Sequence, residues 1–205
     1  MNIAKDQIMI VADPNYFPAK AFEMASVLSK VHEKGVTFLY VPTGKEKDMH
    51  EVENGMEEWC SLYAEELTQP LGYYILEEDF TDFMENNEVR SVIFELIPNS
   101  MYPNCKKPLK LCRELRIAYY FLKPNQVINY KKVLVPVGFL VEEKEKGVFC
   151  SGMGRLLHSE ILLMTAKDCG SRAKENAAGI RTILDKFKIR YSDIPAQKDS
   201  FKIEL

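Results

Sequence analysis

IMIVADPN, residues 8–15, is the stretch of the sequence that decides the fold. Its unbroken apolar run predicts a buried strand, and the Asp-Pro-Asn that follows predicts a turn at the end of that strand. Apolar residues then recur at helical spacing at Ala21, Met24, Leu28 and Val31. This spacing predicts a helix with one buried face. The chain therefore begins with a strand that runs into a helix.

The same alternation continues to residue 123. Further strands are expected at residues 36–41, 71–78, 89–97 and 117–123. Helices are expected between them, from a capping-box pattern at Thr43 to Glu46, from Asp79, and over residues 108–116. Five strands with four intervening helices predict a parallel α/β sheet that lies between helices, because parallel neighbours need crossover connections.

The pattern starts again in the last third of the chain. Strands are expected at residues 133–137, 160–166 and 189–195, with helices at about 142–157 and 171–187. They repeat the first three strands of the preceding part. We therefore expect a complete domain over residues 1–126 and a partial second domain over residues 127–205.

Composition and motifs exclude several classes of protein. The chain of 205 residues is 46% hydrophobic and has a net charge of −3, which argues against disorder and against nucleic acid as a general partner. No apolar stretch approaches the roughly 20 residues of a membrane helix, and a cytoplasmic location is expected. The five cysteines form no CxxC pair. The sequence has no nucleophile-elbow, P-loop or helical zinc motif, so neither an enzyme nor a metal site is expected.

Residues 131–168, KKVLVPVGFLVEEKEKGVFCSGMGRLLHSEILLMTAKD, resemble the opening of the universal stress protein family. That family begins with a strand of the form ILVPVD, a short loop, a helix that ends before a small residue, and a strand closed by Asp. Residues 7–123 resemble a complete, divergent domain of the same kind, with VAD at 11–13 where the family has its VD. The resemblance implies a tandem of three-layer α/β/α domains of the adenine-nucleotide-alpha-hydrolase-like type, with strand order 3-2-1-4-5 in the first.

The resemblance also implies where a nucleotide would bind. In ATP-binding members an aspartate after the first strand holds the nucleoside, backbone after the second strand meets adenine, and a glycine-rich loop after the fourth strand cradles the phosphates. Asp13 matches the aspartate, and Val41 stands at the adenine position. Gly138 replaces the corresponding aspartate in the second half.

The glycine-rich loop is missing. No glycine occurs between residues 73 and 137, and the loop after the fourth strand reads PNSMYPNCKKP. Glycine lets backbone N–H groups approach an anion, so only side chains remain to bind a phosphate here. The candidates are Ser100, Lys106 and Lys107.

Each candidate also has a purely structural interpretation. Asp13 before Pro-Asn is an ordinary turn former, and the two lysines suit a solvated loop. Cys169 precedes a helix and basic residues, which favours a thiolate, but a buried inert thiol is the commoner case. The glycines of Gly152-Met-Gly154 are best explained by close helix packing.

These features predict a stress-response protein without a cofactor that acts through self-association, as a homodimer, or through protein partners. The alternative is a regulator that binds ATP or another adenine nucleotide through Asp13 and a rebuilt loop at residues 98–107. The strand at 133–137 would lie at a sheet edge because the second half lacks a fourth strand. Such an edge predicts either a longer native chain or a covered surface in a homodimer.

Overall fold

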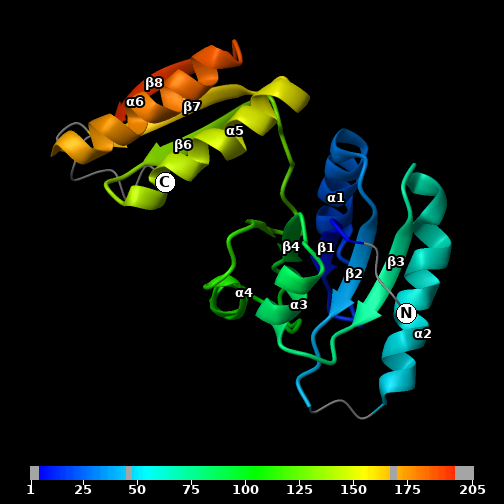
Figure 1. The fold of residues 1–205 in the computed structure, drawn as a ribbon. Helices are drawn as coiled ribbons and strands as arrows, with labels where there is room; N and C mark the ends of the chain where they lie inside the picture. Colours follow the sequence, from blue (N-terminus) through cyan, green and yellow to red (C-terminus); the bar gives the residue numbers. More distant parts are fainter. Residues whose placement is uncertain (1–4, 45–47, 167–169, 197–205) are drawn as a thin grey trace. The chain divides into compact units, whose positions relative to one another are not determined.

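The computed structural model describes residues 5–44, 48–166 and 170–196 (Figure 1). The chain divides into two compact units between Ile128 and Asn129. The first unit holds a five-stranded sheet and the second a three-stranded sheet. All neighbouring strands within each sheet are parallel.

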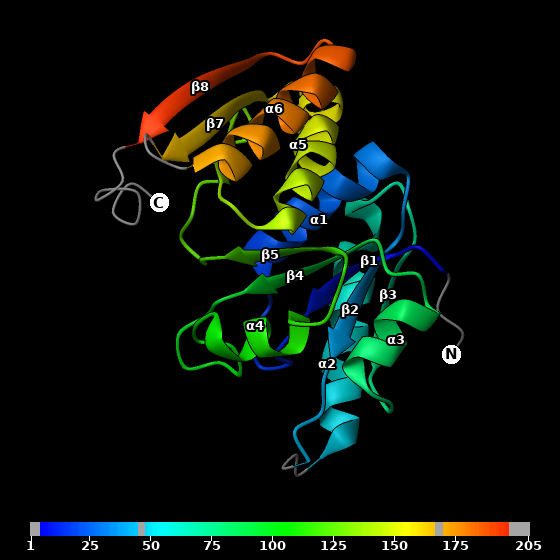
Figure 2. The same ribbon diagram turned by 60° about the vertical axis from the view of Figure 1, so that its left-hand side comes forward.

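The first unit has the expected strand order, β3-β2-β1-β4-β5. Its strands are β1 (Ile8–Val11), β2 (Val36–Tyr40), β3 (Leu71–Ile75), β4 (Ser91–Glu95) and β5 (Ala118–Leu122). Its helices are α1 (Ala19–His32), α2 (Met49–Tyr63), α3 (Phe80–Asn86) and α4 (Lys106–Cys112), with a 3-10 turn η1 (Ala64–Glu66) after α2. The α/β class and the sheet order predicted above are confirmed. Figure 2 shows β5 beside β4 at one edge of this sheet.

Helices cover both faces of the five-stranded sheet, because alternate residues of each strand point to opposite faces. On one face an aromatic cluster joins β2 to α1 and α2; it consists of Phe17, Phe22, Phe38, Trp59 and Tyr63. On the other face Met9, Val11, Leu39, Val92 and Phe94 pack against α3 and α4 through Phe80, Phe83, Met84 and Cys112. The first unit therefore has three layers.

The second unit repeats the first three strands. Its sheet has the order β6-β7-β8, formed by β6 (Lys132–Val137), β7 (Glu160–Ala166) and β8 (Tyr191–Ala196). A 3-10 turn η2 (Val141–Lys144), α5 (Glu145–Leu156) and α6 (Gly170–Lys186) connect the strands. Val135, Val137, Ile161 and Leu163 of the sheet pack against Cys150 of α5 and against Ala177, Ile180 and Leu184 of α6. As predicted, β6 lies at an edge of this sheet.

The start of α2 differs from the sequence-based expectation. The capping box at Thr43 to Glu46 is wrong: Asp48 is the N-cap, and its carboxylate accepts hydrogen bonds from the N–H groups of His50 at 2.9 Å and Glu51 at 3.3 Å. Gly44 has a φ of 73°, a left-handed conformation that a helix cannot contain. Lys45 and Glu46 lie outside the described residues.

Candidate functional site

The carboxyl ends of β1 and β4 form the edge of the first sheet where a ligand would be expected. The chain leaves these two neighbouring strands toward opposite faces of the sheet, which is the usual ligand position in open α/β folds. Two acidic residues lie here, Asp13 just beyond β1 and Glu95 at the last position of β4. Both are buried, Asp13 with 6% and Glu95 with 5% of its surface exposed. Their hydrogen bonds therefore decide what this edge can bind.

Asp13 binds backbone and side-chain donors of its own chain. Its Oδ1 accepts hydrogen bonds from the backbone N–H and the side-chain amide of Asn15, both at 3.0 Å. Its Oδ2 accepts one from the backbone N–H of Met101 at 2.7 Å. The carboxylate thus forms the turn after β1 and ties it to the loop after β4. Both of its oxygens are engaged within the protein.

The loop after β4 covers this edge with apolar side chains. Tyr102 belongs to the buried core cluster, and Met101 packs against that cluster. The Tyr102 ring meets the edge of Phe94 with ring centroids 5.5 Å apart. Burial, together with the negative charge of Asp13, raises the pKa of Tyr102 far above its usual value, so its hydroxyl stays neutral. Met101 and Tyr102 of the loop after β4 thus lie beside Asp13, where a ligand would otherwise bind.

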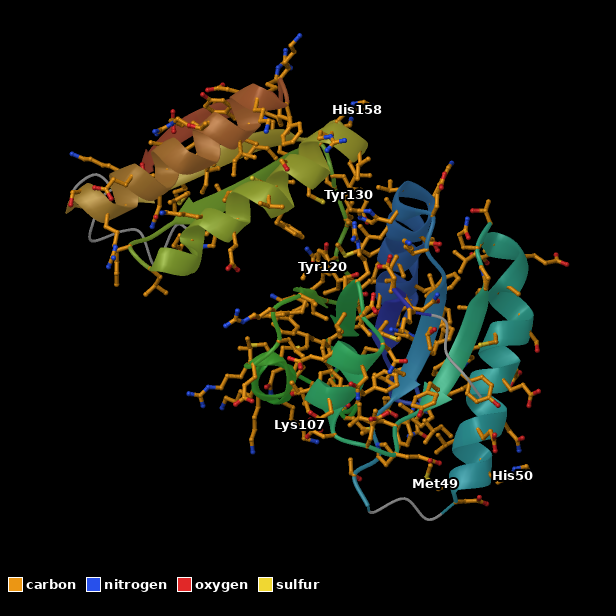
Figure 3. All side chains as sticks on the ribbon, in the orientation of Figure 1. Met49, His50, Lys107, Tyr120, Tyr130 and His158 are labelled. Atoms are coloured by element: carbon orange, nitrogen blue, oxygen red, sulfur yellow. The ribbon has the colours of Figure 1, made fainter. Side chains whose placement is uncertain are left out.

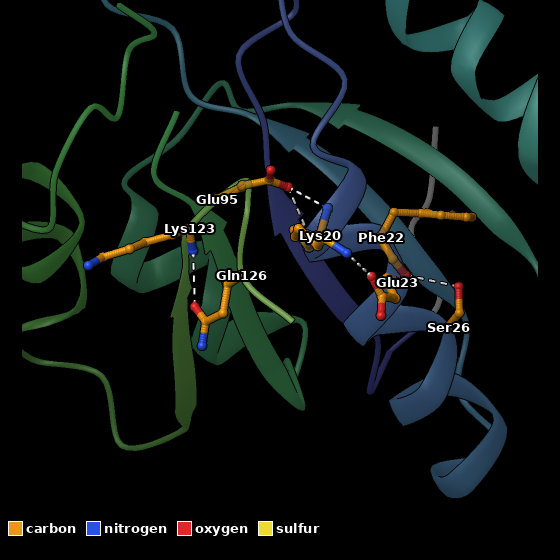
Figure 4. Close-up of polar contacts among 8 residues, drawn as sticks. Lys20, Phe22, Glu23, Ser26, Glu95, Lys123 and Gln126 are labelled. Atoms are coloured by element: carbon orange, nitrogen blue, oxygen red, sulfur yellow. Dashed lines mark hydrogen bonds and ion pairs between the residues drawn. The ribbon is translucent and has the colours of Figure 1, made fainter. Parts of the chain in front are cut away.

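Glu95 caps a helix that has no cap of its own. The N-cap of α1, Pro18, offers no side-chain hydrogen bond. Glu95 Oε2 accepts hydrogen bonds from the N–H groups of Lys20 at 2.6 Å and Ala21 at 3.0 Å (Figure 4). Burial raises the pKa of Glu95, and these two bonds oppose that rise. A helix N-terminus attracts anions, and here a carboxylate of the same chain already occupies it.

Sequence reasoning missed Glu95. It was included in the expected strand at residues 89–97, and its only signal is a carboxylate at the end of a buried apolar run. Its partners, Lys20 and Ala21, precede it by more than seventy residues. Nothing local in the sequence predicts that pairing.

The other predicted residues have structural or surface positions. Ser100 Oγ donates to the Ile97 carbonyl at 2.7 Å and accepts from the Tyr102 N–H at 3.1 Å, so it shapes the loop. Val41 is half-buried and packs against the core on the side of α3. Lys106 and Lys107 are exposed at the start of α4, where Figure 3 labels Lys107. Neither lysine forms an ion pair with any residue that the structure describes.

The equivalent edge of the second unit is also held by internal bonds. The Gly138 N–H donates to Glu143 Oε2 at 3.1 Å. The buried amide of Asn176 donates to the carbonyls of Gly138 at 3.1 Å and Leu140 at 2.8 Å. Lys146 Nζ lies 2.6 Å from the Glu143 carboxylate and donates to the Pro136 carbonyl at 2.7 Å. The loop after β6 is thereby fixed without an aspartate.

The thiols and the remaining acidic groups offer no further site. Cys60, Cys105, Cys112 and Cys150 are free, and burial raises the pKa of Cys112 to about 12 and of Cys150 to about 11. Cys169 lies outside the described residues. In the described part of the chain no three His, Cys, Asp or Glu side chains gather to hold a metal. No described helix is long and apolar enough to cross a membrane.

Solved structures share this fold. A universal stress protein from Archaeoglobus fulgidus DSM 4304 matches with a TM-score of 0.63 at 10% identity, over 98% of this chain and 83% of that protein. A functionally unknown protein, PA1789 from Pseudomonas aeruginosa PAO1, matches with a TM-score of 0.56 at 12% identity, over 98% of this chain and 79% of that protein. No protein-family model matches the sequence, and a search of curated proteins finds no significant match. The chain thus has the α/β fold of universal stress proteins, as its sequence resemblance implied.

Proposed function

We propose that this chain is a universal-stress-protein-like protein of the cytoplasmic stress response that has no enzymatic activity. We further propose that it does not bind ATP in the family's manner and acts through self-association or protein partners. The observation that carries the proposal is the internal use of Asp13 and Glu95. Asp13 accepts bonds from Asn15 and Met101, and Glu95 occupies the N-terminus of α1.

The energetics support the absence of tight ATP binding. A hydrogen bond to a charged group contributes about 1.5–3 kcal/mol. A loop without glycine loses about two or three backbone donors to the phosphates, which corresponds to a factor of about a thousand or more in affinity. Asp13 would in addition have to release the Met101 N–H before it could hold a ribose.

Exposed apolar side chains support the proposed role in association. In the second unit Phe139 is 69% and Val148 67% exposed, and Leu134 lies exposed on the edge strand β6. Exposed apolar groups and a strand edge with free backbone groups both favour contact with another chain. A second copy of this chain or another protein would cover them.

Calorimetry with the full chain tests the nucleotide half of the proposal. ATP and adenosine should bind equally poorly, since only a weak contact with the nucleoside end remains. Mass spectrometry of ligand released from denatured protein should find no stoichiometric adenine nucleotide. Micromolar ATP affinity that exceeds the affinity for adenosine would contradict the proposal.

The second candidate function is a nucleotide-binding regulator that uses Asp13 and a rebuilt loop at residues 98–107. The exposed ammonium groups of Lys106 and Lys107 at the start of α4 favour it. The double variant Lys106→Ala, Lys107→Ala separates the two candidates. Loss of a measured ATP affinity in this variant would support the regulator.

A further inference from the structure

The second unit contains a pocket at the end opposite to its candidate nucleotide edge. The pocket has a volume of about 490 Å³ and is formed where α5 and α6 end and where β7 and β8 begin. Its lining includes Arg155, His158, Phe187, Lys188, Ile189 and Arg190. The volume lies within the range of about 300–1,000 Å³ typical of small-ligand sites.

The lining of this pocket is strongly basic. It contains Arg155, Lys188 and Arg190 together with His158, and no acidic side chain lines it. Within the described ranges none of the three cations belongs to an ion pair. Like charges that share a pocket repel one another, and a bound anion would relieve this repulsion.

Phe187 holds one of these cations in place. The guanidinium carbon of Arg155 lies over the Phe187 ring, 4.9 Å from its centroid. Such stacking restricts the long side chain while its N–H groups remain able to donate hydrogen bonds. Phe187 and the buried Ile189 also give the pocket an apolar wall.

The corresponding end of the first unit is built differently. Two cations there are neutralised: Lys34 Nζ lies 2.6 Å from Asp6, and Lys5 Nζ lies 2.7 Å from Glu88. Arg90, just before β4, forms no ion pair with a described residue. The fold therefore has a way to pair cations at this end. The second unit leaves its cations facing a pocket instead.

The helix dipole does not account for the basic residues. One or two residues after a helix ends, the backbone has a positive φ at Glu33 and Glu88 in the first unit and at His158 and Lys188 in the second. The negative end of a helix dipole favours a cation, yet the first unit has glutamates at this position. The dipole therefore does not explain why the second unit has basic residues there. Glycine would also fit this backbone better than Lys188, whose φ is 55°.

We propose that this pocket binds a small, multiply charged phosphate ligand. Arg155, Lys188 and Arg190 would hold phosphoryl oxygens, because guanidinium groups match the geometry of phosphate and several cations suit a multivalent anion. Phe187 and Ile189 would contact an organic portion of the ligand. This site does not use Asp13, Glu95 or the loop at residues 98–107.

Titration calorimetry of the full chain with inorganic pyrophosphate tests this proposal. Saturable binding that weakens with added salt is expected. Lys188→Gly should weaken it about tenfold or more by removing one charge-assisted contact. Because glycine suits the left-handed backbone, the same variant should melt at the same temperature as the wild type or higher. Lost binding with intact stability then reports on the pocket rather than on folding.

Lys174→Gln is the matched control. It removes one exposed cation from α6 near the helix end opposite to the pocket and should leave pyrophosphate binding unchanged. An equal loss of binding in Lys174→Gln and Lys188→Gly would overturn the proposal in favour of general charge attraction. Absence of saturable binding would also overturn it. So would tighter binding of a single-stranded RNA oligonucleotide that Lys188→Gly abolishes, which would make the surface a nucleic-acid site.

Discussion

At the scale of single residues, Asp13 is a structural tie between two loops. Its carboxylate is buried and accepts three hydrogen bonds, one of them from a backbone N–H 88 positions away. A buried donor that loses its partner costs about 1–3 kcal/mol, since it cannot return to water. The aspartate that the sequence resemblance made a candidate nucleoside contact therefore stabilises the edge of the sheet.

Asp13→Ala should lower the free energy of unfolding by about 1.5–3 kcal/mol, because it leaves the Met101 N–H without its acceptor. Urea denaturation measures this change. Asp79→Ala is the control: the exposed Asp79 also accepts two N–H groups, as the N-cap of α3, and its loss should cost only about 1 kcal/mol. A smaller effect of Asp13→Ala than of Asp79→Ala would contradict the assignment. Self-association should change little in either variant.

Glu95 gives stability a defined pH dependence. Burial raises its pKa in the folded state above the ordinary value of 4.5, so the folded state binds more protons than the unfolded state just above pH 4.5. The contribution of Glu95 to stability therefore falls as pH rises through this window. We expect the free energy of unfolding of the wild type to rise relative to that of Glu95→Gln as the pH is lowered from 7 to 4.5. Denaturation of both proteins across this pH range measures the difference. A difference that does not vary with pH would count against a buried, titrating Glu95.

At the scale of elements, α5 shows how two glycines in one helix have different roles. A Cβ added to Gly154 would lie 2.3 Å from Ile189 Cγ2, whereas a Cβ at Gly152 would meet nothing within 4 Å. The sequence-based explanation of close packing for Gly152-Met-Gly154 thus holds for Gly154 alone. Gly154 lets α5 approach Ile189, which lies two residues before β8.

Gly154→Ala should destabilise the chain by about 1–3 kcal/mol, because the added methyl group overlaps Ile189. Gly152→Ala should stabilise it by up to about 1 kcal/mol, since alanine favours a helix over glycine and finds open space. Thermal unfolding of the two variants checks both signs. Equal effects of the two substitutions would be incompatible with this packing.

At the scale of the whole molecule, the proposed dimer rests on the edge strand β6. Among the strands that the structure describes it pairs with β7 alone, and Leu134 on it is 40% exposed. Sedimentation equilibrium at micromolar concentration should give twice the chain mass of 23.6 kDa. Leu134→Lys should shift the protein toward monomer, because a charge on an edge strand opposes pairing.

Leu109→Lys is the control for the dimer prediction. Leu109 is 45% exposed on α4 in the first unit. Leu109→Lys therefore adds the same charge and removes a similarly exposed apolar side chain as Leu134→Lys does. It should leave the mass unchanged. A monomeric wild type would exclude a dimer formed through β6. So would an equal loss of mass in Leu134→Lys and Leu109→Lys.

Local patterns in the sequence determined the elements and their order. Apolar runs and helical spacing depend on a few neighbouring residues, so they predicted the parallel α/β class, and the family resemblance supplied the order 3-2-1-4-5 that the structure confirms. The position of Asp13 after β1 could also be predicted, because it depends on the neighbouring apolar run alone. Its interpretation as a turn former was also correct.

Only the tertiary structure decided what the polar groups do. The pairing of Glu95 with Lys20 and Ala21, and of Asp13 with Met101, joins segments far apart in the chain. The basic pocket likewise combines residues 154–159 with residues 187–190. A buried polar group takes whichever partner the register of the sheet and the path of the loops bring within about 3 Å. That distance is set by packing across the whole unit, which no local pattern encodes.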